Sequence, residues 1–209
     1  MNDPARDRAA LVDRLRSRER LDDERVLDAL ETVPRHEFVP EERRDRAYVD
    51  SPLPIGEEQT ISAPHMVAIM ATLLELQPGD RVLEIGTGCG YHAAVTAELV
   101  GAENVYSVEY HDSLAQAARE RLAATGYGDV SVRPGDGKQG WADHAPYDRA
   151  YLTCAAPEFP RAVVEQTRPG GLVLAPIGNG RQRLVRARRR ADGSLERETH
   201  GAVRFVPLQ

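Results

Sequence analysis

The chain has 209 residues, the length of one domain, and 41% of them are hydrophobic, which is enough for a core. Its formal net charge of -6 argues against a protein whose whole surface binds nucleic acid. The two cysteines lie far apart and form neither a disulfide framework nor a zinc motif, so we expect no metal site and a cytoplasmic location. Residues 1–20 are charged throughout and no stretch approaches a membrane helix, so we expect no signal peptide and no membrane partner.

The N-terminal part of the sequence predicts three helices and one long loop. Apolar residues at helical spacing predict helices over residues 4–18 and 22–34, the second of which ends at a proline. Prolines and a glycine spread through residues 36–64 predict a long loop, and such loops inside compact domains are usually functional. A third helix is expected over residues 63–76.

From residue 77 onward, strands alternate with helices. Strands are expected at residues 81–85, 105–108, 130–133, 147–153 and 171–176, and helices at residues 91–99, 113–124 and 159–166. This alternation predicts an α/β fold with a mostly parallel, doubly wound sheet of the Rossmann-like type. Residues 181–190 and 194–199 flank Ala191-Asp192-Gly193, a hairpin turn, and residues 203–208 would form a last strand.

These elements predict one compact domain with two parts. Residues 1–76 would form an N-terminal helical extension and a substrate-side loop packed on the core. Residues 77–209 would form the Rossmann-like core, with antiparallel C-terminal strands at its edge.

Three glycines at alternate positions follow the first strand of that core, in the run Glu84-Ile85-Gly86-Thr87-Gly88-Cys89-Gly90-Tyr91. Glycines let the backbone turn sharply and let a ligand approach, and the following helix offers free N–H groups. A dinucleotide motif G-x-G-x-x-G would end on Tyr91 or on Ala93; the alanine is an allowed variant, so this alternative stays open. With Glu84, the run resembles the first motif of class I methyltransferases, whose cofactor S-adenosylmethionine has no pyrophosphate for a carboxylate to repel.

Two more acidic residues follow later strands. Glu109 ends the second strand of the core, where a carboxylate can accept hydrogen bonds from both ribose hydroxyls. Asp136 lies in Gly135-Asp136-Gly137 after the third strand, where methyltransferases contact the adenine edge. Each acid could instead cap a helix or lie exposed. The expected cofactor-binding residues of the core are Glu84, Gly86, Thr87, Gly88, Cys89, Gly90, Glu109, Asp136 and Gly137.

A second motif precedes the glycine loop: residues 52–66 read P-L-P-I-G-E-E-Q-T-I-S-A-P-H-M. This stretch resembles the protein-L-isoaspartate O-methyltransferase family, which carries P-L-P-I-G-x-G-Q-T-I-S-x-P-x-M there. The similarity extends to residues 33–40, 135–137, 155–157, 168–171 and 203–208. It implies a repair enzyme that methylates the α-carboxylate of L-isoaspartyl residues in damaged proteins and peptides, using S-adenosylmethionine. We expect it to be a monomer.

The resemblance also assigns catalytic and substrate-binding residues. Ser62 matches the active-site serine of the family, and Thr60 is a second hydroxyl that could hold a carboxylate without neutralising it. Ser62 could instead cap the helix over residues 63–76. His65 is expected to contact the cofactor or the substrate, with a surface or packing role as the alternative. The peptide substrate would be bound by Ile61, Ser62, Val206, Pro207 and Leu208.

Two departures from the family pattern matter. Glu58 stands where the family usually has glycine, and would repel an anionic substrate if its side chain faced the pocket. Cys89 replaces a common serine of similar size. One alternative is therefore a non-catalytic homologue that binds cofactor or peptide. The other is a nucleic-acid methyltransferase that uses the basic hairpin around residues 181–190, although no aromatic cluster and no Asn/Asp-Pro-Pro-Tyr motif accompanies these arginines.

Overall fold

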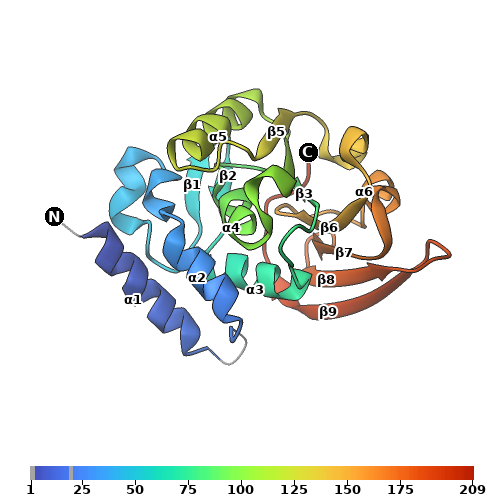
Figure 1. Ribbon diagram of the computed structural model, residues 1–209, viewed down its shortest axis with the longest axis horizontal. Helices are drawn as coiled ribbons and strands as arrows, with labels where there is room; N and C mark the ends of the chain where they lie inside the picture. The colour runs from blue at the N-terminus through green and yellow to red at the C-terminus, as the bar shows by residue number, and fades with distance from the viewer. Residues whose placement is uncertain (1–2, 19–20) are drawn as a thin grey trace.

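The computed structural model describes residues 3–18 and 21–209 (Figure 1); residues 1–2 and 19–20 of the charged N-terminal segment lie outside the described residues. Helix α1 (Pro4–Arg16) begins after Asp3, whose side chain accepts a hydrogen bond from the backbone N–H of Ala5. Helix α2 (Glu24–Thr32) begins after Asp23, which caps it in the same way. Both predicted helices are thus confirmed, with slightly shorter bounds. Among the described residues, no helix combines the length and the hydropathy needed to cross a membrane.

The prediction of a continuous loop over residues 36–64 is wrong. After two short 3-10 turns, η1 (Arg35–Glu37) and η2 (Glu41–Arg46), the chain forms an antiparallel hairpin of β1 (Leu53–Gly56) and β2 (Gln59–Ile61). This hairpin was not predicted because of its turn. Glu57 and Glu58 have left-handed backbone (φ 49° and 57°), a conformation that is usually occupied by glycine or asparagine.

The main sheet has seven strands, in the spatial order β5-β4-β3-β6-β7-β8-β9. Their bounds are β3 (Val82–Ile85), β4 (Val105–Glu109), β5 (Ser131–Pro134), β6 (Tyr147–Leu152), β7 (Thr167–Ile177), β8 (Gln182–Arg189) and β9 (Leu195–Val203). The first five are parallel, and β8 and β9 are antiparallel to their neighbours. The predicted Rossmann-like sheet with antiparallel edge strands is confirmed.

The order of the strands reverses between β3 and β6, which are neighbours although two strands separate them in sequence. In open parallel sheets, ligands bind in the crevice that such a reversal leaves beyond the carboxyl ends of the strands. The glycine loop follows β3 directly, and Thr153 and Cys154 follow β6. The fold therefore places the predicted cofactor loop where this architecture binds its ligands.

Helices cover both faces of the sheet (Figure 1). They are α3 (Pro64–Leu74), α4 (Tyr91–Val100), α5 (Asp112–Ala124) and α6 (Arg161–Gln166), with 3-10 turns η3 (Ala102–Asn104), η4 (Gly137–Gln139) and η5 (Ala142–His144). Alternate side chains of β3 enter different cores: Val82 packs with the cluster that includes α1 to α5, whereas Leu83 and Ile85 pack with α6. The first cluster joins residues of both predicted parts of the chain.

The prediction of a last strand over residues 203–208 is wrong. Strand β9 ends at Val203, and the chain then turns back over the carboxyl edge of the sheet. There the N–H of Ala155 donates to the carbonyl oxygen of Val206 (2.7 Å), and that of Leu208 donates to Ala155 (2.8 Å). Pro207 has no N–H with which to continue a ladder, so only an isolated bridge forms.

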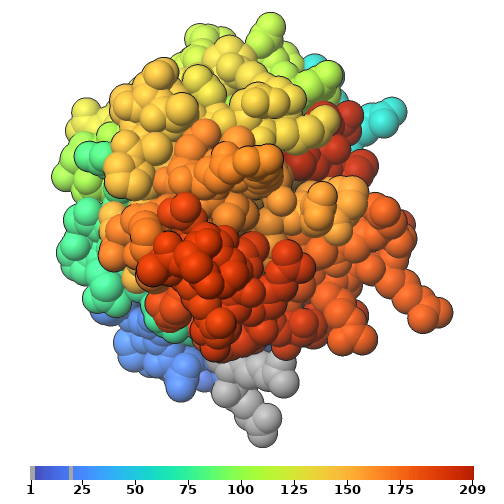
Figure 2. Space-filling model, turned by 90° about the vertical axis from the view of Figure 1, so that its right-hand side faces the viewer, coloured from blue at the N-terminus to red at the C-terminus, as the bar shows by residue number. Residues whose placement is uncertain are grey.

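Strands β8 and β9 cover one end of the molecule (Figure 2). Three of the six arginines in residues 181–190 form ion pairs with glutamates of the same chain: Arg186, Arg188 and Arg190. Arg186 forms ion pairs with Glu75 (2.7 Å) and with Glu198 (2.6 Å). Arg190 pairs with Glu196 (3.2 Å). These pairs make the hairpin an ion-paired sheet edge, at which Arg181 and Arg183 remain exposed.

Candidate active site

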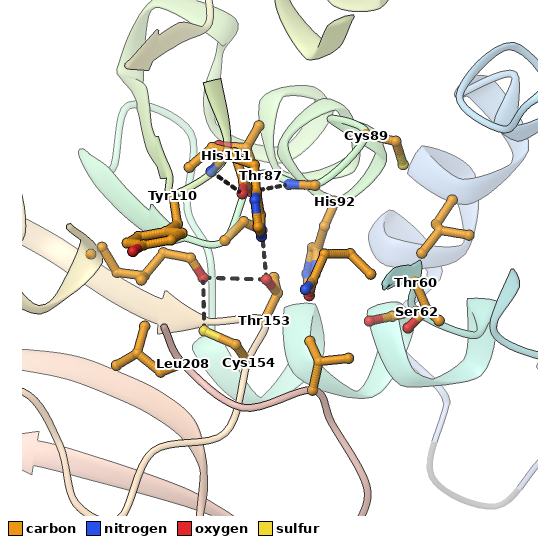
Figure 3. Close-up of a pocket in the computed structure, with 18 of the residues that line it drawn as sticks. Thr60, Ser62, Thr87, Cys89, His92, Tyr110, His111, Thr153, Cys154 and Leu208 are labelled. Carbon is orange, nitrogen blue, oxygen red and sulfur yellow. Dashed lines mark hydrogen bonds between the residues drawn. The ribbon is translucent and has the colours of Figure 1, made fainter. Parts of the chain in front are cut away.

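A single cleft opens at the carboxyl edge of the sheet, between the glycine loop, the end of the β1–β2 hairpin and the C-terminal segment (Figure 3). Its volume is about 750 Å³, counted with the part open to solvent. It brings together most of the predicted site residues. These are Thr60, Ile61, Ser62, Gly86, Thr87, Gly88, Cys89, Glu109, Gly137, Val206, Pro207 and Leu208.

The glycines of this cleft are required by close packing as well as by backbone conformation. Gly86 has a φ of +95°, and a Cβ there would lie 2.3 Å from Thr153 Oγ1. A Cβ on Gly137 would lie 2.3 Å from the Cγ2 of Ile85. A real side chain at either position would force its neighbour to move. Glycine thus lets the loop after β3 and the turn η4 lie tightly against the sheet, leaving the space above them open.

Glu109 links the end of β4 to the glycine loop. Its Oε2 accepts a hydrogen bond from the backbone N–H of Gly88 (2.8 Å), and its Oε1 accepts one from that of His111 (3.1 Å). Its side chain is buried yet lines the cleft. Because each carboxylate oxygen has a further acceptor site, Glu109 is held in place and still able to accept hydrogen bonds from a diol.

Ser62 and Thr60 line the cleft from the end of the β1–β2 hairpin (Figure 3). The alternative role of Ser62 as a helix cap is wrong: Ala63 occupies the N-cap position of α3, and no side chain at that position caps the helix. Asp50 instead accepts a hydrogen bond from the backbone N–H of His65 (3.0 Å). The hydroxyl of Ser62 is therefore not needed to begin α3.

Glu84 does not line the cleft, contrary to the sequence-based expectation. Its side chain is fully buried between Tyr151, whose hydroxyl donates to Oε1 (2.8 Å), and Ser107, whose hydroxyl donates to Oε2 (2.5 Å). Burial raises its pKa to about 8. Ser107 also lies 2.6 Å from the hydroxyl of Thr87, so Glu84 supports the glycine loop from beneath.

Three other predicted cofactor residues also lie outside the lining of the cleft. Gly90 has a φ of +92° and packs against α5, where a Cβ would lie 3.1 Å from Leu122. The side chain of Asp136 accepts a hydrogen bond from the N–H of Lys138 (2.9 Å). His65 is bound through its Nδ1 to Asp50 (2.8 Å). Each of the three makes a local structural contact, and their role toward the cofactor stays a prediction.

Sequence inspection missed several residues that line the cleft. Tyr110 and His111 follow Glu109 directly, and Thr153 follows β6. The rule that carboxyl ends of parallel strands meet at one edge would have found all three. His92, in the first turn of α4, carried no comparable signal, because one histidine in an apolar helix usually packs in a core.

Glu58 faces solvent and does not line the cleft. Its neighbour Glu57 accepts a hydrogen bond from the hydroxyl of Ser113 (2.8 Å), which ties the hairpin turn to the start of α5. The repulsion of an anionic substrate, which would apply to a pocket-facing glutamate, therefore does not arise from Glu58. This removes the reason to expect an inactive homologue.

Comparison with known proteins agrees with this geometry. The sequence profile of the protein-L-isoaspartate(D-aspartate) O-methyltransferase family matches residues 6–209. The chain is 51% identical over 203 residues to protein-L-isoaspartate O-methyltransferase 2 of Archaeoglobus fulgidus, covering 97% of this chain and 92% of the relative. It is 52% identical over 206 residues to the protein-L-isoaspartate O-methyltransferase of Methanopyrus kandleri, covering 97% of this chain and 91% of that relative.

Solved structures give the same result. A protein-L-isoaspartate O-methyltransferase superposes with a TM-score of 0.86 at 30% identity, over 96% of this chain and 65% of that longer chain. A putative member from Plasmodium falciparum, solved with S-adenosyl-L-homocysteine, has a TM-score of 0.84 at 23% identity, over 100% and 99% of the two chains, and supports the fold. The dinucleotide alternative is thereby excluded. The chain belongs to the protein-L-isoaspartate O-methyltransferase family of S-adenosylmethionine-dependent carboxyl methyltransferases.

Proposed function

We propose that this enzyme transfers the methyl group of S-adenosylmethionine to the α-carboxylate of L-isoaspartyl residues in damaged proteins and peptides. The observation that carries the proposal is a single cleft lined on one side by the glycine loop and Glu109, and on the other by the hydroxyls of Thr60 and Ser62. A donor site and an acceptor site thus share one cavity. Direct transfer between bound molecules requires this arrangement.

The donor side of the cleft fits an adenosine-based cofactor. Ile85 and Val108 supply apolar surface for a flat ring system, and Gly137 lies close against Ile85 at the same wall of the cleft. Glu109 can accept hydrogen bonds from the ribose hydroxyls, while its two backbone contacts fix its position. S-adenosylmethionine supplies a methyl group activated by its bond to a sulfonium sulfur.

The acceptor side suits a nucleophile that needs no base. A carboxyl group has a pKa near 4 and is ionised at neutral pH. Thr60 and Ser62 can donate hydrogen bonds to the carboxylate and align it without neutralising it. One carboxylate oxygen then bonds to the methyl carbon as the carbon–sulfur bond breaks, and that electron pair stays on sulfur. No proton moves, so catalysis is mainly a matter of positioning, which is worth up to roughly 7–11 kcal/mol.

The remaining parts of the chain take supporting roles in this proposal. We assign a substrate-side role to the part of the chain before residue 77, and the catalytic core to residues 77–209. The backbone of Val206, Pro207 and Leu208 binds the peptide, supported by the contacts of this segment with Ala155. We further propose that the enzyme acts as a monomer in the cytoplasm. Among the described residues, the only exposed large hydrophobic side chains are Val49 and Tyr110, too few for an obligate interface.

A paired-peptide assay tests this function. Two synthetic peptides differ only in carrying an L-isoaspartyl or a normal aspartyl residue, and each is incubated with the enzyme and methyl-labelled S-adenosylmethionine. We expect base-labile label on the isoaspartyl peptide alone. Equal labelling of both peptides would refute the substrate assignment. Binding of S-adenosylhomocysteine without label on either peptide would show a non-catalytic homologue.

A further inference from the structure

His92 is an anomaly within helix α4. Every residue of this helix except Glu98 is buried, and the helix is otherwise built almost entirely of small and apolar side chains. His92 is only 6% exposed, and within the described part of the chain neither of its ring nitrogens has a hydrogen-bond partner. A buried polar group without a partner costs on the order of 1–3 kcal/mol, so such a group normally has a purpose.

His92 lines the cleft (Figure 3), and both of its ring nitrogens are buried beside it. Its ring packs against the ring of Tyr151, with centroids 4.6 Å apart. The hydroxyl of Tyr151 is already engaged by Glu84 (2.8 Å) and by Thr96 (3.0 Å), and so does not satisfy the imidazole. Tyr151 therefore leaves the imidazole without a partner, and the cleft that His92 lines is the place where a bound ligand can supply one.

The chemistry of the cleft indicates which ligand group would accept a hydrogen bond from His92. In the part of the chain that the structure describes, no arginine or lysine lines the cleft. The proposed reaction nevertheless brings two carboxylates into it, that of the donor's amino-acid part and that of the isoaspartyl residue. The donors that remain for them include hydroxyls, backbone N–H groups and the rings of His92 and His111. Burial lowers the pKa of His92 to about 3, so the ring is neutral and offers one N–H.

We propose that His92 is a carboxylate-binding residue of this active site, which donates a ring N–H to one of these two carboxylates from the first turn of α4. This inference rests on the proposed function. A neutral donor suits the position for two reasons: it does not repel a sulfonium, and it leaves the negative charge of an accepting carboxylate available for attack on the methyl group.

Two variants and three probes test the assignment. H92F keeps a ring to pack on Tyr151 but has no N–H, whereas H92Q keeps a donor. Calorimetry gives Kd for S-adenosylhomocysteine and for 5′-methylthioadenosine, which lacks the amino-acid part, and initial rates give KM for the isoaspartyl peptide. A hydrogen bond to a charged group is worth about ten-fold or more in affinity. We expect H92Q to retain most of the ligand affinity that H92F loses.

The pattern of losses identifies the carboxylate. If His92 binds the donor, H92F weakens S-adenosylhomocysteine about ten-fold and leaves 5′-methylthioadenosine unchanged. If it binds the acceptor, KM for the peptide rises about ten-fold and both nucleoside affinities stay as they are. Unchanged values throughout, or equal losses for the two nucleosides, would overturn the proposal, because packing alone would explain them.

A measurement on the unaltered enzyme covers the case in which H92F does not fold. The ring nitrogen signals of His92 in an NMR spectrum should shift when S-adenosylhomocysteine or the peptide is added, and should not shift with 5′-methylthioadenosine. Absence of any shift with the first two ligands at saturation would also refute the assignment. The nucleoside experiments do not require turnover, so failure of the isoaspartyl function remains distinguishable from failure of this inference.

Discussion

Most of the side chains that line the cleft carry no formal charge. Glu109 is the only lining residue among those described that carries a side-chain carboxylate, and two backbone N–H groups fix it. On the acceptor side, Thr60 and Ser62 contribute hydroxyls. This distribution suits a reaction between a sulfonium and a carboxylate, whose opposite charges already attract each other and disappear together as the ester forms.

The hydroxyl of Ser62 should matter for turnover and little for the fold. S62A removes one hydrogen bond to the accepting carboxylate, so we expect kcat/KM for the isoaspartyl peptide to fall about ten-fold to a hundred-fold. The affinity for S-adenosylhomocysteine and the melting temperature should change little, because Ser62 does not cap α3. T72V in the same helix removes a buried hydroxyl that does not line the cleft and should leave kcat/KM unchanged. Parallel loss of stability and activity in S62A would make Ser62 structural.

The buried carboxyl of Glu84 should make stability depend on pH. Burial raises its folded pKa to about 8 from an ordinary 4.5, so the folded chain holds a proton that the unfolded chain releases between these values. The free energy of unfolding of the natural enzyme should therefore fall as pH rises through this window, by up to about 1.4 kcal/mol per pH unit from this group. E84Q, which cannot ionise, should lack this contribution.

Denaturant unfolding at pH 5 and at pH 7.5 measures this effect. The stability of E84Q relative to the natural enzyme should increase from the lower to the higher pH. A constant difference would mean that Glu84 is ionised in the folded protein.

At the scale of elements, the β1–β2 hairpin carries Thr60 and Ile61 to the cleft through a strained turn. Glu57 and Glu58 both have left-handed backbone, which costs an L-residue about 1–2 kcal/mol. E58G should relieve this strain, although the greater entropy of glycine in the unfolded chain offsets part of the gain. We expect the free energy of unfolding to rise by up to about 1 kcal/mol. In a chain of this size, that corresponds to a melting temperature roughly 2–4 °C higher.

The neighbouring residue provides a comparison. E57G relieves similar strain but loses the hydrogen bond with Ser113, so its gain should be smaller. KM for the isoaspartyl peptide should not change in E58G, because this side chain does not line the cleft. A lower melting temperature for E58G would show that the turn is not strained.

The regular elements were predictable because short apolar runs of strand length alternate with longer helical stretches. Alternate residues of β3 face different cores, and α4 continues the strand–loop–helix pattern directly after Gly90. The β1–β2 hairpin was missed because its strands are short, contain a proline and meet in a turn without glycine. The prediction of a strand at residues 203–208 was wrong because the apolar residues there line the cleft and contact Ala155, and do not pair with a neighbouring strand.

The candidate site was predictable only in part, for a physical reason. Motif spacing identifies backbone positions near a ligand, and it correctly brought Gly86, Gly88 and Glu109 to one cleft. It does not show whether a side chain faces the ligand or the core. Glu84 faces the core because alternate residues of a strand point to opposite sides, and at this position the side chain meets Tyr151.

At the scale of the whole molecule, the reversal of strand order between β3 and β6 creates the crevice, and one segment from the N-terminal third and one from the C-terminal part of the chain close it. Residues 59–62 approach from the N-terminal part, and residues 206–208 return from β9. No one segment contains a complete site. The activity should therefore require the whole described fold, including the ion-paired hairpin that leads back to the cleft.

The crystal structure of this enzyme with S-adenosylhomocysteine and an isoaspartyl peptide tests the central claim most directly. We predict that the nucleoside lies over the glycine loop with its ribose hydroxyls on Glu109, and that the peptide carboxylate lies between Thr60 and Ser62. A complex in which this cleft is empty or filled by side chains, with the ligands bound elsewhere, would contradict the account.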